Sequence, residues 1–136
     1  MKKIALEIVS PERLVLKEDV DFIALPAYEG EMGVLPGHTP ILAQLSIGQM
    51  RYKKGDQTET LSLSGGFAEI HPDKVEVFAE TAEMAKEIDS ERARLALERA
   101  KTQITKAATP QDLVAAQAAL RRALLRLRVS GGLRRK

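Results

Sequence analysis

The sequence predicts an α+β fold, in which an N-terminal antiparallel β-sandwich of two sheets is followed by a C-terminal hairpin of two antiparallel helices. Up to about residue 85, short apolar stretches alternate with polar residues, and glycines or prolines separate them, as in sandwiches and barrels. From residue 86 the chain is rich in Ala, Leu and Arg, with no glycine before Gly131. We therefore expect two domains, residues 1–85 and residues 86–136, with a helix N-cap at Asp89 near their junction.

Short strands separated by turn residues make up the first predicted domain. They cover residues 3–9, 13–16, 21–25, 49–53, 59–64, 67–70 and 74–78. A charged turn is predicted at residues 17–19, and hairpin turns at residues 54–56 and 71–73. Residues 30–41 hold three glycines and two prolines, which predicts a tight corner without regular structure.

Two amphipathic helices are predicted in the second domain. Asp89 or Ser90 caps the first, which runs to about residue 106, and Thr109 caps the second, which has Pro110 in its first position and ends near Ser130. Their apolar stripes are Ala93, Leu97, Ala100 and Ile104, and Leu113, Ala116, Leu120, Leu124 and Leu127. A short loop between such helices gives an antiparallel hairpin. Because the stripes contain much alanine, the helices pack closely but bury little, so the hairpin is a candidate for movement.

The small net charge of +2 hides a strong asymmetry. Residues 1–85 hold 8 Lys and Arg against 14 Asp and Glu, whereas residues 86–136 hold 13 against 5. The halves are therefore expected to face different partners. The basic half suits nucleic acid, anionic lipid, nucleotide phosphates or an acidic protein surface. The low aromatic content of 4%, with no aromatic residue after Phe78, disfavours a surface that stacks bases.

Several classes of site are not expected in this chain. There is no cysteine, hence no disulfide or thiolate metal site. No apolar run reaches the ~20 residues of a membrane span, and the N-terminus becomes acidic too early for a signal peptide, so an intracellular protein without direct membrane insertion is expected. His38 and Glu31 lack both a second histidine for a metal and a group to orient the imidazole. With His71 interpreted as a solvated turn residue, we predict neither catalytic residues nor metal ligands.

Arginines recur at helical spacing in the second half. Arg92 and Arg99 lie seven apart, and Arg122 and Arg126 four apart, so each pair shares one side of its helix. In a folded hairpin the four can converge on one anion, and guanidinium groups suit phosphate oxygens. Solvated surface arginines, with Asp89 only a helix cap, explain the same pattern. The residues alone leave both interpretations open.

Four segments together resemble the epsilon subunit of F-type ATP synthase over essentially the whole chain. They are residues 30–40, with Gly33-Val34-Leu35-Pro36-Gly37-His38-Thr39-Pro40 at the centre, and residues 45–48, 63–70 and 88–93. The resemblance implies a non-catalytic rotor subunit of the central stalk, whose sandwich binds gamma and stands on the c-ring. Glu31 and His38 would then face the c-ring. It also implies a peripheral position on the cytoplasmic side of the cell membrane, with a thylakoid setting left open.

The same resemblance implies a regulatory hairpin that binds ATP. Folded, it would permit ATP hydrolysis; extended along gamma towards the catalytic head, it would inhibit hydrolysis. The segment Ile88-Asp89-Ser90-Glu91-Arg92-Ala93 resembles the family's nucleotide-binding motif. By this analogy Ile88, Asp89, Arg92 and Ala93 lie at the base, Arg99, Arg122 and Arg126 hold phosphates, and Glu83 is a further contact. ATP is thus the expected regulatory ligand, the role of Mg stays open, and a nucleic-acid-binding module that uses the basic hairpin is the alternative.

Overall fold

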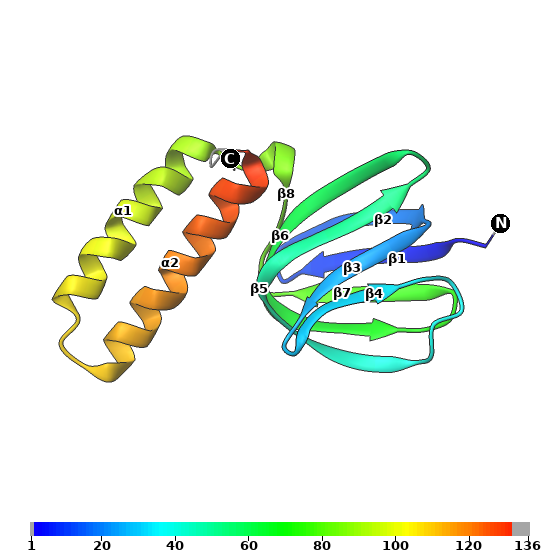
Figure 1. Ribbon diagram of the computed structural model, residues 1–136, viewed down its shortest axis with the longest axis horizontal. Coiled ribbons are helices and arrows are strands. Elements are labelled where there is room, and N and C mark those ends of the chain that lie inside the picture. Colours follow the sequence, from blue (N-terminus) through cyan, green and yellow to red (C-terminus); the bar gives the residue numbers. More distant parts are fainter. Residues whose placement is uncertain (1, 132–136) are drawn as a thin grey trace. The chain divides into compact units, whose positions relative to one another are not determined.

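The computed structural model describes residues 2–131, which fall into two compact units, Met1–Met84 and Ala85–Lys136 (Figure 1). The predicted second domain extends to residue 136, so its last five residues lie outside the described part. The elements are β1 (Ile4–Ser10), β2 (Arg13–Val20), β3 (Phe22–Ala27), β4 (Gly30–Val34), β5 (Ile41–Lys54), β6 (Gln57–Ile70), β7 (Lys74–Ala79), β8 (Ala82–Met84), the 3-10 turn η1 (Ala85–Glu87), α1 (Ser90–Lys106) and α2 (Pro110–Ser130). Among residues 2–131, no helix is long and apolar enough to cross a membrane.

The first unit is a two-layered β-sandwich, as predicted, but its strands form one hydrogen-bonded path. The order is β2-β1-β7-β6-β5-β3-β4, and β8 also pairs with β6. The two layers seen in Figure 1 are joined because β5 and β6, each 14 residues long, take part in both. β1 and β7 pair in parallel, which the prediction of an antiparallel sandwich did not include.

β6 bends from one layer to the other at Gly65 and Gly66. Both residues have positive φ, of 78° and 110°, a region that favours glycine. A Cβ atom at position 66 would lie 2.0 Å from the carbonyl oxygen of Phe78, so a side chain there would collide with backbone. The two glycines are therefore required by the bend between the layers.

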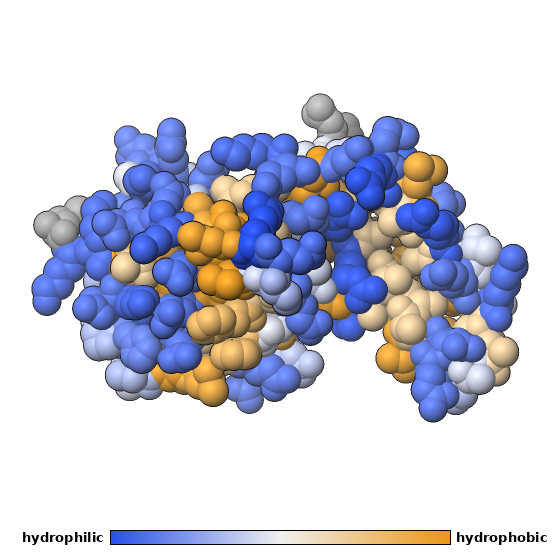
Figure 2. All heavy atoms as spheres, turned by 180° about the vertical axis from the view of Figure 1, so that it is seen from behind, coloured by the Kyte–Doolittle hydropathy of each residue, from blue (hydrophilic) through white to orange (hydrophobic). Residues whose placement is uncertain are grey.

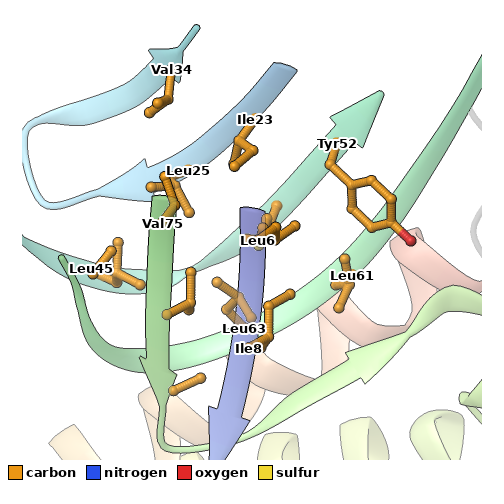
Figure 3. Packing of buried hydrophobic residues seen from close by; sticks show 14 of the residues in the cluster. Leu6, Ile8, Ile23, Leu25, Val34, Leu45, Tyr52, Leu61, Leu63 and Val75 are labelled. Atoms are coloured by element: carbon orange, nitrogen blue, oxygen red, sulfur yellow. The ribbon is translucent and has the colours of Figure 1, made fainter. Parts of the chain in front are cut away.

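The sandwich has a hydrophobic core of its own. Alternate residues of β1, namely Ile4, Leu6 and Ile8, are completely buried. Figure 3 shows Leu6 and Ile8 gathered with side chains from β3, β5 and β6. Every member of this cluster lies between Ile4 and Met84. Because a fully buried aliphatic side chain contributes about 1.5–3 kcal/mol, the first unit carries the means of its own stability.

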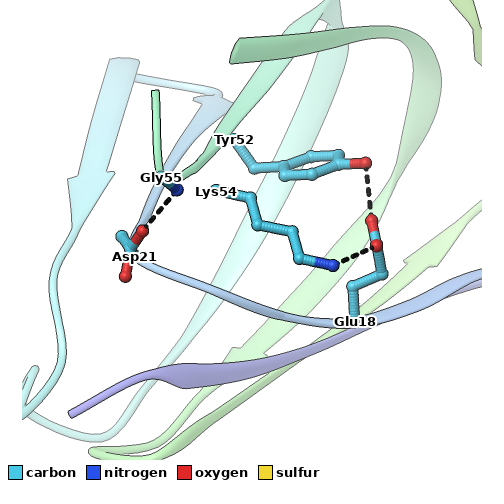
Figure 4. Close-up of polar contacts among 5 residues, drawn as sticks. All are labelled: Glu18, Asp21, Tyr52, Lys54 and Gly55. Carbon is cyan, nitrogen blue, oxygen red and sulfur yellow. Dashed lines mark hydrogen bonds and ion pairs between the residues drawn. The ribbon is translucent and has the colours of Figure 1, made fainter. Parts of the chain in front are cut away.

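Two predictions of irregular structure are wrong. The expected turn at residues 17–19 lies inside β2, where the Glu18 carboxylate accepts from the Tyr52 hydroxyl at 2.9 Å and from Lys54 Nζ at 2.8 Å (Figure 4). These partners are 34 and 36 residues away in sequence, so local residue preferences do not reveal them. Residues 30–34 form β4, paired with β3, so the irregular corner is shorter than expected.

Asp21 is a second acidic side chain, beside Glu18, that holds the β5–β6 hairpin. Asp21 accepts a hydrogen bond from the backbone N–H of Gly55 at 2.8 Å, which holds the tip of the β5–β6 hairpin (Figure 4), and it pairs with Lys3. The hydrogen bond from Lys3, followed by that from Gly55, lowers the pKa of Asp21. Folding therefore favours the ionised carboxylate of Asp21, which adds to the stability of the folded chain at neutral pH. This added stability is lost as the pH falls through the lowered pKa.

Replacing Tyr52 by Phe is expected to cost about 1 kcal/mol of unfolding free energy at neutral pH, because the hydrogen bond to Glu18 is lost. Burial, with Glu18 as the second cause, raises the pKa of Tyr52. The folded chain therefore keeps this proton above pH ~10, where the unfolded chain loses it, so Tyr52 makes stability fall as the pH rises. Tyr52→Phe should make that alkaline fall shallower, as measured by denaturant unfolding at several pH values. Equal alkaline slopes for the two proteins would contradict this account.

Candidate functional site

Side-chain caps fix where each helix of the second unit begins. Asp89 has extended backbone geometry, and its carboxylate accepts from the backbone N–H of Arg92 at 3.1 Å. Thr109 does the same for α2, since its hydroxyl accepts from the N–H of Asp112 at 3.0 Å. Gly131, with φ of 85°, ends α2. The predicted helix ends are thus confirmed, and the Asp89 carboxylate has a structural role of its own.

The contact between α1 and α2 is narrow and built from small residues. Its buried centre is Ala93, Leu97, Ala123 and Leu127, with Ala96, Leu120 and Leu124 packed around it. Apolar side chains nearer the connecting loop stay exposed: Leu113 is 37% and Val114 64% exposed. The larger apolar side chains of the helix contact are therefore buried mainly at the end of the hairpin away from the connecting loop.

One hydrogen bond gives the register of the two helices. The hydroxyls of Ser90, at the start of α1, and Ser130, at the end of α2, lie 3.0 Å apart. The two helices run in opposite directions with the same rise per residue, so each step forward along α1 matches one step back along α2. Two residues at the same height along the hairpin therefore have numbers that sum to about 220, as Ser90 and Ser130 do. The buried centre agrees, since Ala93 then faces Leu127 and Leu97 faces Ala123. Both serines lie at predicted helix ends, but their contact joins positions 40 residues apart and so has no local signal in the sequence.

In this register the four predicted arginines form two pairs of similar height along the hairpin. Arg92 is two residues, about 3 Å, from the height of Arg126, and Arg99 is one residue, about 1.5 Å, from the height of Arg122. In each helix these arginines lie roughly 100–140° around the axis from the buried stripe. Because both helices are right-handed and run antiparallel, the arginines of α1 and those of α2 lie on the same side of the hairpin. Arg92, Arg99 and Arg122 are exposed there, and Arg126 is half-buried.

The other predicted ligand contacts have different surroundings. Ile88 is buried, at 8% exposed, and Ala93 is completely buried in the centre of the hairpin. In this conformation Ala93 therefore serves the close approach of the helices. Glu83 belongs to β8, where it pairs with Ser62 of β6, so it lies in the other unit from the arginines.

The corner that holds the predicted c-ring contacts is exposed and anchored. Glu31, on β4, pairs with Arg51 at 3.0 Å, and its side chain is 57% exposed. Nδ1 of His38 donates to the carbonyl of Thr39 at 2.7 Å. The N–H of Gly37 donates to the carbonyl of Pro72 at 2.6 Å, which ties the corner to the β6–β7 turn. Glu31 and His38 have partners other than each other, which suits a contact surface better than acid–base chemistry.

The sandwich also exposes apolar side chains, and the face seen in Figure 2 carries a band of apolar atoms between hydrophilic areas. Phe67 is 44% exposed and stacks on Phe78, with ring centroids 5.1 Å apart. With Val9 and Pro11 these rings line an open groove of about 420 Å³. The groove is therefore an exposed, largely apolar surface of the sandwich.

Comparison with known proteins covers both units. Residues 3–85 match the family described as ATP synthase, Delta/Epsilon chain, beta-sandwich domain, and residues 86–131 match its long alpha-helix domain. The chain is 49% identical over 130 residues to the ATP synthase epsilon chain of Nitratidesulfovibrio vulgaris, covering 96% of this chain and 97% of that one. It is 43% identical to the epsilon chain of Bacillus velezensis, covering 96% and 99%.

A solved structure agrees with these relatives. A chain in the cryo-EM structure of the Euglena gracilis mitochondrial ATP synthase, OSCP/F1/c-ring in rotational state 1, superposes with a TM-score of 0.79 at 28% identity. The match covers 91% of this chain and 79% of that one. The alternative of a nucleic-acid-binding module receives no support from any of these relatives.

Proposed function

The chain belongs to the ATP synthase delta/epsilon family, and we propose that it is the non-catalytic rotor subunit that joins gamma to the c-ring in a proton-translocating F-type ATP synthase. The observation that carries this proposal is the match to epsilon chains across both units, at 49% identity over 130 residues. Through its place in the complex, the chain is held on the cytoplasmic side of the cell membrane. Co-purification with the other synthase subunits tests the assignment, and failure to associate with them would overturn it.

Gamma is assigned to the apolar groove of the sandwich. The stacked pair Phe67 and Phe78 offers a large apolar contact beside Val9 and Pro11, and aromatic side chains are enriched at such interfaces. The sandwich is the appropriate unit for a permanent contact because its core is self-contained. It therefore stays folded whatever the hairpin does.

The c-ring is assigned to the corner around Glu31 and His38. Cysteine substitution at either position is expected to give cross-links to the polar loop of the c-ring in the assembled complex, because both side chains lie at an anchored, exposed corner. The chain has no cysteine of its own, so each cross-link reports one position. Asp56, at the tip of the β5–β6 hairpin, is a matched control. Cross-links only to the catalytic head would contradict this orientation.

Regulation is assigned to the hairpin. It is weakly held by a narrow, alanine-rich contact, and residues 86–136 carry the basic balance of 13 Lys and Arg against 5 Asp and Glu. Extended along gamma, this basic segment would meet acidic surface of the catalytic head and block hydrolysis. Folded, it presents Arg92, Arg99, Arg122 and Arg126 on one side, and ATP stabilises that form. ATP can shift the equilibrium between the folded and extended forms only by as much as its affinities for the two forms differ.

A further inference from the structure

Three side chains with metal-ligating atoms meet at the β6–β7 hairpin of the sandwich. They are Glu69 near the end of β6, His71 just after it, and Glu76 on β7. One ligand atom from each lies within 4.8 Å of the other two, and all three residues are half-buried. Nε2 of His71 is 3.6 Å from a carboxylate oxygen of Glu69. The cluster therefore combines one imidazole nitrogen with two carboxylates.

The backbone holds this cluster in place. Glu69 and Glu76 are directly opposite each other in the antiparallel β6–β7 ladder, so their side chains leave the same face of the sheet. The N–H of His71 donates to the carbonyl of Lys74 at 2.8 Å, which closes the turn. The turn is itself tied to the corner by the bond from Gly37 to Pro72. The backbone positions of the three residues are therefore fixed, and only their side-chain torsions can vary.

Carboxylates outnumber ammonium groups around the cluster. Glu7 on β1 pairs in register with Glu76, so carboxylates occupy three adjacent strands in one row, Glu7, Glu76 and Glu69. Like charges directly opposite each other destabilise a sheet. Two lysines offer partial compensation: Lys17 on β2 pairs in register with Glu7, and the ammonium of Lys74 is 3.7 Å from Glu76. A divalent cation between Glu69 and Glu76 would remove their repulsion.

We propose that Glu69, His71 and Glu76 form a site for a divalent transition-metal ion of the zinc class. Mixed imidazole and carboxylate ligands suit Zn²⁺ and its neighbours, whereas Mg²⁺ and Ca²⁺ prefer oxygen ligands alone. Metal–ligand bonds of about 2.0–2.2 Å require the ligand atoms to close by about 1–1.5 Å, a movement that rotation of the two glutamate side chains would have to supply. Three protein ligands leave a fourth position for water. This assignment revises the interpretation of His71 as a solvated turn residue.

Calorimetric titration of the full chain with ZnCl₂ tests the site. One ion per chain is expected, and His71→Ala or Glu76→Gln should each weaken binding by about tenfold or more, as losses in a metal site typically do. His38→Ala, which removes the other histidine of the chain, should leave binding unchanged. Lys74→Gln should tighten it, because the ammonium competes for Glu76. MgCl₂ at the same concentration should not displace the zinc.

Three outcomes would overturn the site. They are no binding at millimolar zinc, equal losses in His38→Ala and His71→Ala, and full binding retained by Glu76→Gln. The last would show that His71 alone takes up the ion without a built site. Circular dichroism confirms that each variant is folded, and should His71→Ala fail to fold, Glu76→Gln carries the test alone. Cobalt gives a second readout, since its visible absorption should appear with the wild-type chain and be lost in Glu76→Gln.

Discussion

A chain that ends after Lys86 is expected to fold, to assemble with gamma, and to raise ATP hydrolysis by the synthase several-fold above that with the full chain. Folding is expected because every residue of the sandwich core lies between Ile4 and Met84, and β8 completes the strand pairing at Met84. The gamma groove is also retained, since its residues lie between Val9 and Glu80. Hydrolysis rises because the segment that blocks the catalytic head has been removed.

The truncated chain is assayed by its thermal unfolding and by the hydrolysis rate of reconstituted complex at fixed ATP. The full chain, reconstituted in parallel, is the control. A truncated chain that is folded and assembled but leaves the rate unchanged would contradict the division of labour between sandwich and hairpin.

Loss of either Arg122 or Arg126 is expected to weaken ATP binding by about tenfold or more. A charge-assisted bond to phosphate contributes about 1.5–3 kcal/mol, and 1.4 kcal/mol corresponds to a factor of ten. Arg121→Ala is the matched control, because it removes the same charge from the same helix but lies on the other flank, about 100° around from Arg122. Arg94→Ala is a second control, on α1, because Arg94 pairs with Glu91.

Calorimetry on the isolated full chain measures these affinities. Inhibition of hydrolysis should also become less sensitive to ATP in Arg126→Ala, because the folded form loses its ligand. Equal weakening in Arg121→Ala and Arg122→Ala would mean that only net charge attracts the nucleotide. No ATP binding by the wild-type chain at millimolar concentration would defeat the sensor role built on these arginines.

Local signals in the sequence were sufficient to predict where the helices of the second unit begin and end. The caps at Asp89 and Thr109 depend on residues three positions away, so each helix start could be predicted from its own segment. The heights of the arginines could not be predicted, because they depend on the contact between Ser90 and Ser130, 40 residues apart. Periodicity therefore predicts which side of each helix the arginines occupy, and tertiary packing determines which of them lie at the same height.

Long-range contacts explain where the strand predictions failed. Lys17-Glu18-Asp19 has the composition of a turn, yet Glu18 is held by Tyr52 and Lys54 from the β5–β6 hairpin. The parallel pairing of β1 with β7 joins segments about 70 residues apart and leaves no local signal. The same is true of the cluster of Glu69, His71 and Glu76, because the sequence shows one histidine and two separate glutamates, whereas the ladder register brings the glutamates together.

Locking the hairpin in its folded form tests most directly whether it must open to inhibit. The Ser90 and Ser130 hydroxyls are 3.0 Å apart, and a disulfide needs about 2.05 Å between its sulfurs, so the double variant Ser90→Cys, Ser130→Cys requires a shift of about 1 Å. The wild-type chain has no cysteine, so this bridge is the one intramolecular disulfide that the variant can form. The account predicts that oxidised complex hydrolyses ATP at the rate of complex with the truncated chain, and that a reducing agent restores inhibition. Equal inhibition with the bridge formed and reduced would contradict it.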